Sequence, residues 1–167
     1  VIEYVTIAQT GNAVDFGDSS LARSKPSGAQ SQTRGLFMGG YNPTELNTMN
    51  FITMSTLGNT ADFGDLTSTR RAGAGGGNSV RAIYAGGERY PSSLAVQTID
   101  FITIATLGNS LDFGDSITGI GRGSSANSPT RMVYNTGNYN SSPSGLEYIQ
   151  IMSTGNSVNY GDLANGR

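Results

Sequence analysis

Residues 99–115 read IDFITIATLGNSLDFGD, and this pattern occurs four times in the 167-residue chain. The other copies are IEYVTIAQTGNAVDFGD at 2–18, MNFITMSTLGNTADFGD at 49–65 and LEYIQIMSTGNSVNYGD at 146–162. Successive copies lie 47, 50 and 47 residues apart. A pattern that recurs about every 50 residues is typical of repeat architectures, in which each unit is one supersecondary element.

Each unit reads as four short strands. The pattern above supplies the third and fourth strands, joined by a turn that contains Gly-Asn. Upstream of it lies an aliphatic and aromatic run that starts at Arg34, Arg81 or Arg131, and a stretch of small residues before that run supplies the first strand. Because β-branched and aromatic residues favour strands, the sequence predicts an all-β fold of four-stranded antiparallel sheets.

The third strands are apolar on both faces. Ile99 and Phe101 point one way along their strand, while Ile102 and Ile104 point the other way. A strand with one wet face would alternate apolar with polar residues. The sequence therefore predicts sheets that stack face to face, as the blades of a β-propeller do.

The units resemble the kelch repeat. The resemblance rests on an arginine that opens the first strand, a Gly-Gly pair after the second, an acidic or amide residue beside an aromatic in the third, and an aromatic in the fourth. The Gly-Gly pairs and fourth-strand aromatics are Gly39, Gly40, Gly86, Gly87, Phe16, Phe63, Phe113 and Tyr160. The family's usual fourth-strand Trp is replaced by Phe or Tyr, and the third Gly-Gly is Thr136-Gly137. The resemblance implies about three and a half kelch-like β-propeller blades.

The repeated pattern also resembles repeat arrays in virion structural proteins of marine bacteriophages, especially cyanophages. That resemblance implies a tail fibre or another appendage. The expected organisation is a partial blade of two strands at 1–20, full blades at 21–68, 69–118 and 119–163, and the start of a further unit at 164–167. We expect one continuous repeat domain whose partners are further repeats of a longer chain or neighbouring protein subunits.

Composition removes several function classes. The chain has no Cys, His or Trp, its charged residues make up 13%, and its net charge is −2. Disulfides, zinc or copper sites built on Cys or His, and triads that need a His base are therefore excluded. No basic patch supports nucleic-acid binding, and no apolar run is long enough to span a membrane. We expect no cofactor.

The recurring DFGD motif offers oxygen ligands that suit calcium. The candidate ligands are Asp15, Asp18, Asp62, Asp65, Asp112 and Asp115. EF-hand spacing is absent, however, and recurrence in every unit indicates a turn in which Gly takes an unusual backbone angle and Asp bonds local amides. We therefore expect a structural motif and no metal site.

The recurring arginines have two interpretations. Arg34, Arg81 and Arg131 could bind an anionic ligand, or they could pair with the Asp and Glu residues that recur in the same units. We favour ion pairs within or between units, because similar numbers of acidic residues recur alongside them.

The segments between second and third strands vary most, and they read YNPTELNT at 41–48, ERYPSSLAVQT at 88–98 and NYNSSPSG at 138–145. Tyr, Asn and Ser are adaptable contact residues, and variable loops on a rigid scaffold are where binding tends to sit. The candidate partner-binding residues are Tyr41, Asn42, Arg89, Tyr90, Asn138, Tyr139 and Asn140. A cell-surface glycan is the candidate ligand, and the alternative is that the Tyr rings pack over the loop or the next blade.

These observations favour a non-enzymatic structural or adhesion module. The expected setting is a phage tail fibre or another virion or extracellular appendage that contacts a host or partner. A carbohydrate-binding propeller of a bacterial cell-surface protein is the alternative. A propeller glycosidase is less favoured, because its paired carboxylates must meet in one cleft, whereas the acids here repeat along the chain.

Overall fold

The protein is all-β, as the sequence predicts. A computed structural model describes residues 1–90, 94–137 and 143–166, and this part of the chain contains strands and turns without any helix. It accordingly has no helix that is long and apolar enough to cross a membrane.

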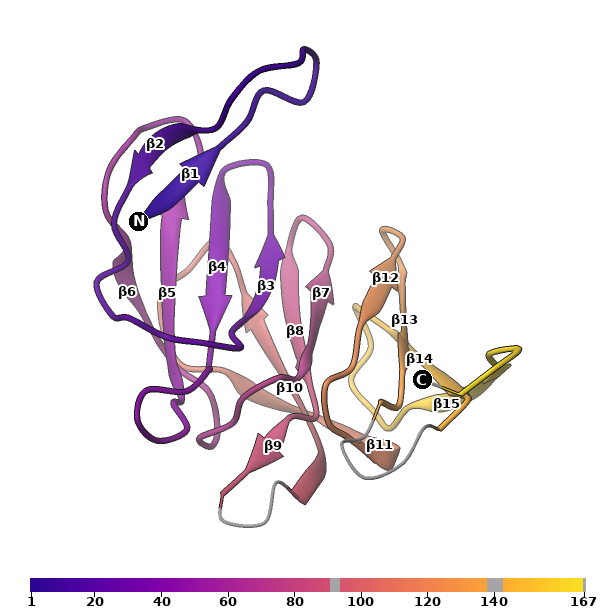
Figure 1. The fold of residues 1–167 in the computed structure, drawn as a ribbon. Coiled ribbons are helices and arrows are strands. Elements are labelled where there is room, and N and C mark those ends of the chain that lie inside the picture. Colours follow the sequence, from indigo (N-terminus) through magenta and orange to yellow (C-terminus); the bar gives the residue numbers. More distant parts are fainter. Residues whose placement is uncertain (91–93, 138–142, 167) are drawn as a thin grey trace.

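The strands form one hairpin and three larger antiparallel sheets (Figure 1). The hairpin pairs β1 (Ile2–Tyr4) with β2 (Val14–Gly17). Sheet 1 has the order β3 (Ser27–Gln30), β4 (Arg34–Met38), β5 (Thr48–Thr53), β6 (Ala61–Asp65). Sheet 2 has the order β7 (Ala74–Gly77), β8 (Arg81–Ala85), β10 (Leu94–Thr103), β11 (Leu111–Ile120), and β9 (Glu88–Arg89) pairs with β10. Sheet 3 has the order β12 (Ser125–Asn127), β13 (Arg131–Asn135), β14 (Gly145–Gln150), β15 (Val158–Asp162).

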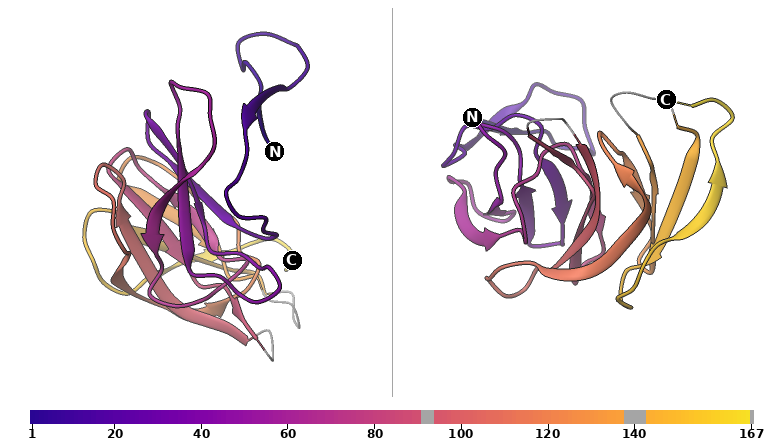
Figure 2. Two further views of the ribbon diagram at one scale, coloured as in Figure 1. Left: turned by 90° about the vertical axis from the view of Figure 1, so that its left-hand side faces the viewer. Right: turned by 90° about the horizontal axis from the view of Figure 1, so that it is seen from below.

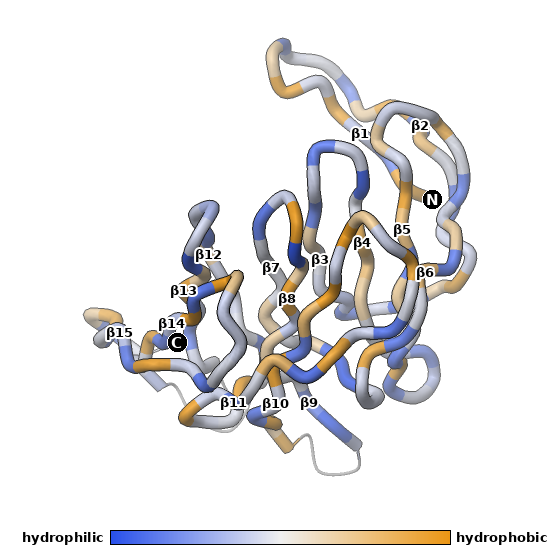
Figure 3. Tube along the Cα trace, turned by 180° about the vertical axis from the view of Figure 1, so that it is seen from behind, coloured by the Kyte–Doolittle hydropathy of each residue, from blue (hydrophilic) through white to orange (hydrophobic). Residues whose placement is uncertain are grey.

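The three sheets follow one another in chain order (Figure 2). An apolar core lies between neighbouring sheets. The core between sheets 1 and 2 contains Leu36, Met38, Met49, Phe63, Ala82, Tyr84, Ile102 and Ile104. The core between sheets 2 and 3 contains Ile83, Ala85, Ile99, Phe113, Met132, Tyr134, Ile149 and Ile151. Figure 3 shows that hydrophobic residues lie along the strands of these sheets, whereas β9 is hydrophilic.

Strand β10 confirms the prediction of two covered faces. Ile99 packs in the core toward sheet 3, while Ile102 and Ile104, which directly follows the strand, pack in the core toward sheet 1. All three side chains are buried. At about 1.5–3 kcal/mol for each buried aliphatic side chain, this two-sided burial is the main stabilising contribution of the strand.

The first strands of the three sheets lie side by side and explain the stretches of small residues. A Cβ on Gly75 in β7 would stand 2.6 Å from the carbonyl oxygen of Gly28 in β3. On the other side, the Ser125 hydroxyl donates to the Gly75 carbonyl at 2.6 Å. Strand β7 is thus held between β3 and β12 at a spacing that larger side chains would not permit.

The DFGD motif fastens each sheet to the next one. Between sheets 1 and 2, the Gly108 amide donates to the Phe63 carbonyl at 2.8 Å and the Ser110 amide donates to the Asp65 carbonyl at 2.8 Å. The Asp65 amide donates in return to Asn109 Oδ1 at 3.0 Å. We call these three hydrogen bonds the clasp. The same clasp joins Phe16 and Asp18 to Gly58, Asn59 and Thr60, and joins Phe113 and Asp115 to Gly155, Asn156 and Ser157.

The clasp explains why Gly follows the aromatic residue in this motif. Gly64 has a φ of 139°, a conformation that side chains disfavour, and a Cβ there would collide with the Gly108 carbonyl. The clasp therefore requires glycine both for its backbone angle and for the close approach of the two sheets.

A β-bulge places the fourth-strand aromatic toward the next sheet. Asn50 pairs with Asp62 and Met49 pairs with Gly64, so that Phe63 is the extra residue of β6. The ring of Phe63 packs edge-on against Phe51 at 5.8 Å. Equivalent register shifts and edge-on pairs occur at Phe16, Phe113 and Tyr160.

The Gly-Gly pairs turn the chain out of the second strand. Gly39 and Gly40 have φ values of 60° and 115°, and Gly86 and Gly87 have values of 67° and 108°. The Gly40 amide donates to the Arg70 carbonyl at 2.9 Å, in the segment that leads to sheet 2. These glycines therefore serve a second contact between consecutive sheets.

The recurring arginines use aromatic rings and backbone carbonyls instead of the acidic partners that the sequence suggested. The guanidinium of Arg34 lies 4.8 Å from the centre of the Phe51 ring and donates to the Ile104 carbonyl of the next sheet at 2.7 Å. Arg81 likewise lies over Phe101 and donates to the Ile151 carbonyl at 3.2 Å. Stacking desolvates one side of the guanidinium while its edge stays free to donate, which arginine achieves better than lysine.

Removing one clasp acceptor should measurably weaken the fold. We expect Asn109→Ala to lower the free energy of unfolding by about 1 kcal/mol, because the Asp65 amide loses its acceptor. Chemical denaturation of dilute protein measures this change. The control is Asn12→Ala, which removes the same side chain where no described residue bonds to it. Equal destabilisation by the two substitutions would contradict the assigned role of the clasp.

Candidate binding site

Two of the three loops that the sequence marked for partner binding lie at one end of the stack. The loop after β4 and strand β9 both lie at the lower end of Figure 1. The Tyr41 ring is covered by the Arg71 guanidinium, 4.9 Å from the ring centre. The Asn42 side chain donates to the Ala22 carbonyl at 2.6 Å. Both residues therefore have contacts within the protein.

The second loop is more accessible. Arg89 ends β9 and is exposed, and the adjacent Tyr90 is also exposed. Asn138, Tyr139 and Asn140 lie outside the described residues. Among the predicted binding residues that are described, Tyr90 is thus the aromatic side chain most open to a partner.

A buried carboxylate ties the segments at this end together. Glu88 is fully buried, and its oxygens lie 3.2 Å from Arg71 Nε and 2.9 Å from Arg122 Nε. Arg71 Nη1 also lies 3.1 Å from Glu45 Oε1. Glu45 lies in the loop between β4 and β5, Glu88 lies in β9, and the two arginines lie in the segments that lead to sheets 2 and 3. No local pattern in the sequence therefore predicts the network. It gives the loops a rigid base.

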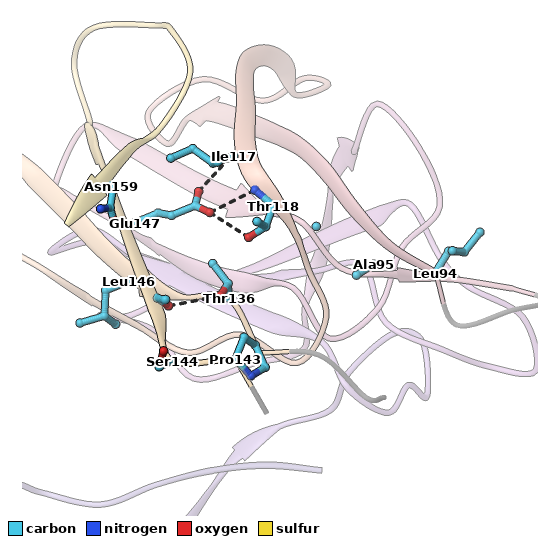
Figure 4. A pocket seen from close by; sticks show the side chains of 12 residues that line it. Leu94, Ala95, Ile117, Thr118, Thr136, Pro143, Ser144, Leu146, Glu147 and Asn159 are labelled. Atoms are coloured by element: carbon cyan, nitrogen blue, oxygen red, sulfur yellow. Dashed lines mark hydrogen bonds between the residues drawn. The ribbon is translucent and has the colours of Figure 1, made fainter. Parts of the chain in front are cut away.

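A cleft of about 840 Å³ lies between sheets 2 and 3 at the same loops (Figure 4). Its apolar wall includes Leu94, Ile117 and Leu146, and Pro143 and Ser144 line its rim. Apolar walls with a few polar groups are typical of ligand sites. No local sequence pattern predicts the cleft, because its walls come from separate units.

Glu147 is the only carboxylate that lines this cleft among the described residues, and its oxygens are occupied. They accept hydrogen bonds from the Ile117 amide at 3.0 Å and from the Thr118 amide at 3.1 Å (Figure 4). The hydroxyl groups of Thr118 and Ser157 donate to it as well. Glu147 therefore anchors the end of β11 to sheet 3.

Asp100 occupies the corresponding place in sheet 2. It forms an ion pair with Arg70 at 2.7 Å, and both side chains are fully buried. The Thr67 amide and the Ser110 hydroxyl donate to the same carboxylate. The third-strand acids are thus structural groups that hold connecting segments against the sheets.

The DFGD aspartates do not gather into a metal site within the part of the chain that the structure describes. That part contains no group of three or more acidic side chains close enough to share an ion. The motif's backbone amides and carbonyls form the clasps described above.

No protein-family model matches this chain, and no curated protein is significantly similar to it.

Breaking the buried ion pair should be costly. We expect Arg70→Met to lower the free energy of unfolding by about 3–5 kcal/mol, because Asp100 is left as an uncompensated buried charge. Denaturant unfolding measures the loss. Arg70→Met combined with Asp100→Asn should recover part of it, and Arg89→Met on the exposed strand β9 should cost little. A loss for Arg70→Met no larger than that for Arg89→Met would contradict the assignment.

Alkaline pH should destabilise the protein through two buried tyrosines. Burial raises the pKa of both Tyr84 and Tyr134 above the ordinary value. The folded state therefore holds these protons more tightly than the unfolded state, so stability is complete below a pH of about 10 and falls as the pH rises further. The free energy of unfolding, measured across this range, should fall less steeply for Tyr134→Phe, whereas Tyr160→Phe at an exposed position should follow the parent protein. Identical pH profiles for the parent protein and Tyr134→Phe would show that Tyr134 does not contribute to the loss of stability at alkaline pH.

Proposed function

We propose that this chain is a non-enzymatic structural and adhesion module built from kelch-like β-propeller blades. Its proposed setting is a phage tail fibre or another virion or extracellular appendage. The observation that carries the proposal is the clasp, which recurs between each pair of consecutive sheets. In it, the recurring DFGD motif holds one sheet against the next.

The buried charges support the same conclusion. Asp100 and Glu147 accept several hydrogen bonds each, and Asp100 also pairs with Arg70. A catalytic acid or base must exchange a proton with substrate, which a fully bonded carboxylate in a sheet contact does not do readily. The polar groups of the repeated motifs therefore serve assembly and stability.

A carbohydrate-binding module of a bacterial cell-surface protein is the second candidate. The cleft beside Leu94 and Glu147, together with the exposed Tyr90, favours it. Aromatic faces and apolar walls suit sugar rings, and variable loops on a rigid scaffold are where binding tends to sit. In this interpretation the cleft binds a surface glycan without cleaving it.

Adsorption to bacterial cells and to immobilised surface polysaccharide tests the adhesive role. We expect Tyr90→Ala to reduce adsorption severalfold, because the ligand loses the Tyr90 ring as a stacking surface. An exposed aromatic anchor contributes about 1–2 kcal/mol to a contact. Tyr4→Ala, on the hairpin at the opposite end of Figure 1, serves as the control. Release of reducing ends from the polysaccharide would overturn the non-enzymatic proposal, and adsorption unchanged by Tyr90→Ala would remove this loop from the binding site.

A further inference from the structure

Sheet 3 has an outer face that no described residue covers. Tyr160 is 55% exposed, whereas Phe113, the corresponding residue of sheet 2, is 2% exposed beneath the following sheet. A Cβ on Gly161 would meet no atom within 4 Å, whereas one on Gly114 would touch the Gly155 carbonyl at 2.5 Å. Residues 160–162 therefore form half of a clasp that no described residue of the same molecule completes.

The β1–β2 hairpin carries the complementary half. Gly11 and Asn12 correspond to Gly108 and Asn109, yet no described residue bonds to their amide or side-chain oxygen. Ile7 is 99% exposed on the projecting loop between β1 and β2, and this loop is partly hydrophobic in Figure 3. Ile104 of sheet 2 and Ile151 of sheet 3 occupy the same repeat position as Ile7, and both are almost completely buried.

Arg131 gives a third match between sheet 3 and the hairpin. In sheet 2, Arg81 stacks on an aromatic ring and donates to the Ile151 carbonyl of the next sheet. Arg131 stacks in the same way over Tyr148, 4.5 Å from its ring centre. Ile7 of the hairpin occupies the same repeat position as Ile151. The Ile7 carbonyl is therefore the acceptor that corresponds to Arg131.

We propose that copies of this chain bind head to tail, with the β1–β2 hairpin of one copy covering the outer face of sheet 3 of another. The Gly11 amide donates to the Tyr160 carbonyl, and the Asp162 amide donates to Asn12 Oδ1. These hydrogen bonds repeat the clasp that already joins each pair of consecutive sheets within the chain.

The apolar part of the contact follows the same template. Ile7 packs against the Tyr148 and Tyr160 rings, and Arg131 donates to the Ile7 carbonyl. Burial of this one isoleucine contributes favourably because its side chain is almost fully in water in the free chain. The occupant is thus a second copy of the chain, since the same chain carries both halves of a contact that it uses internally.

Head-to-tail contacts join two different surfaces, so each added copy leaves one free hairpin and one free sheet 3. Such heterologous association forms open chains when the rotation does not close. The inference deepens the proposed architectural function and rests on it for its biological setting. It predicts an assembly that grows with concentration and does not stop at a dimer.

Sedimentation velocity over a concentration series tests the proposal. We expect the average mass of the intact chain to rise continuously with concentration, and Ile7→Asp to weaken association about tenfold or more, because the contact would bury an unpaired charge. Leu107→Asp is the matched control, since Leu107 is also exposed and apolar but lies on neither end face. A mass that stays monomeric throughout, or equal association of the two variants, would overturn the proposal.

A mixing experiment tests the direction of binding. Ile7→Asp leaves sheet 3 intact, whereas Tyr160→Asp leaves the hairpin intact, so neither variant should extend alone. Their mixture should form a one-to-one complex and stop there. Absence of that complex, with circular dichroism showing both variants folded, would refute the head-to-tail arrangement.

The two proposals fail separately. Association is measured by mass alone, whereas the architectural and adhesive function is measured by adsorption and by the absence of hydrolysis. Self-association accompanied by hydrolysis of a glycan would keep the head-to-tail contact and remove the proposed non-enzymatic function.

Discussion

The contact between a fourth strand and the turn of the following sheet is the constraint on which this structure depends. Each sheet has two apolar faces, and stacked apolar faces alone can slide, because the hydrophobic effect has no direction. The clasp adds direction, since its donors and acceptors meet in one relative position only. Gly64 and its equivalents allow the approach, and the bulge at Phe63 places an aromatic ring in the interface beside it.

Secondary structure and stacking were predictable from the sequence, and the details of the sheet contacts were not. Alternation at Ile99, Phe101, Ile102 and Ile104 predicted two covered faces because side-chain direction in a strand has a period of two. The bulges escaped prediction because only Gly and Asp follow the aromatic residue within a fourth strand such as β6, so no later apolar side chain shows the change of direction. The arginine partners were wrongly expected to be acids, because counting charges in a unit says nothing of which group a neighbouring unit presents to Arg34.

The candidate site also depends on contacts between units, which the sequence does not predict. The variability of their loops predicts Tyr41, Asn42, Arg89 and Tyr90 as binding residues, but it does not reveal that Arg71 covers the Tyr41 ring. The cleft beside Leu146 and the network around Glu88 combine groups from separate units. The recurrence of a Gly-Asn turn after each DFGD motif, with its Asn 41 or 44 residues beyond the last Asp, was the one available signal that two units meet there.

The division of the clasp between consecutive units has a consequence for how such a chain can change. Both halves lie about one unit apart, so inserting or deleting a whole unit rejoins a complete pair, whereas a partial insertion leaves amides and carbonyls without partners. Contacts limited to nearest neighbours also confine the damage from a poor unit to its two interfaces. A gene for this protein can therefore lengthen or shorten in whole steps while the product remains folded.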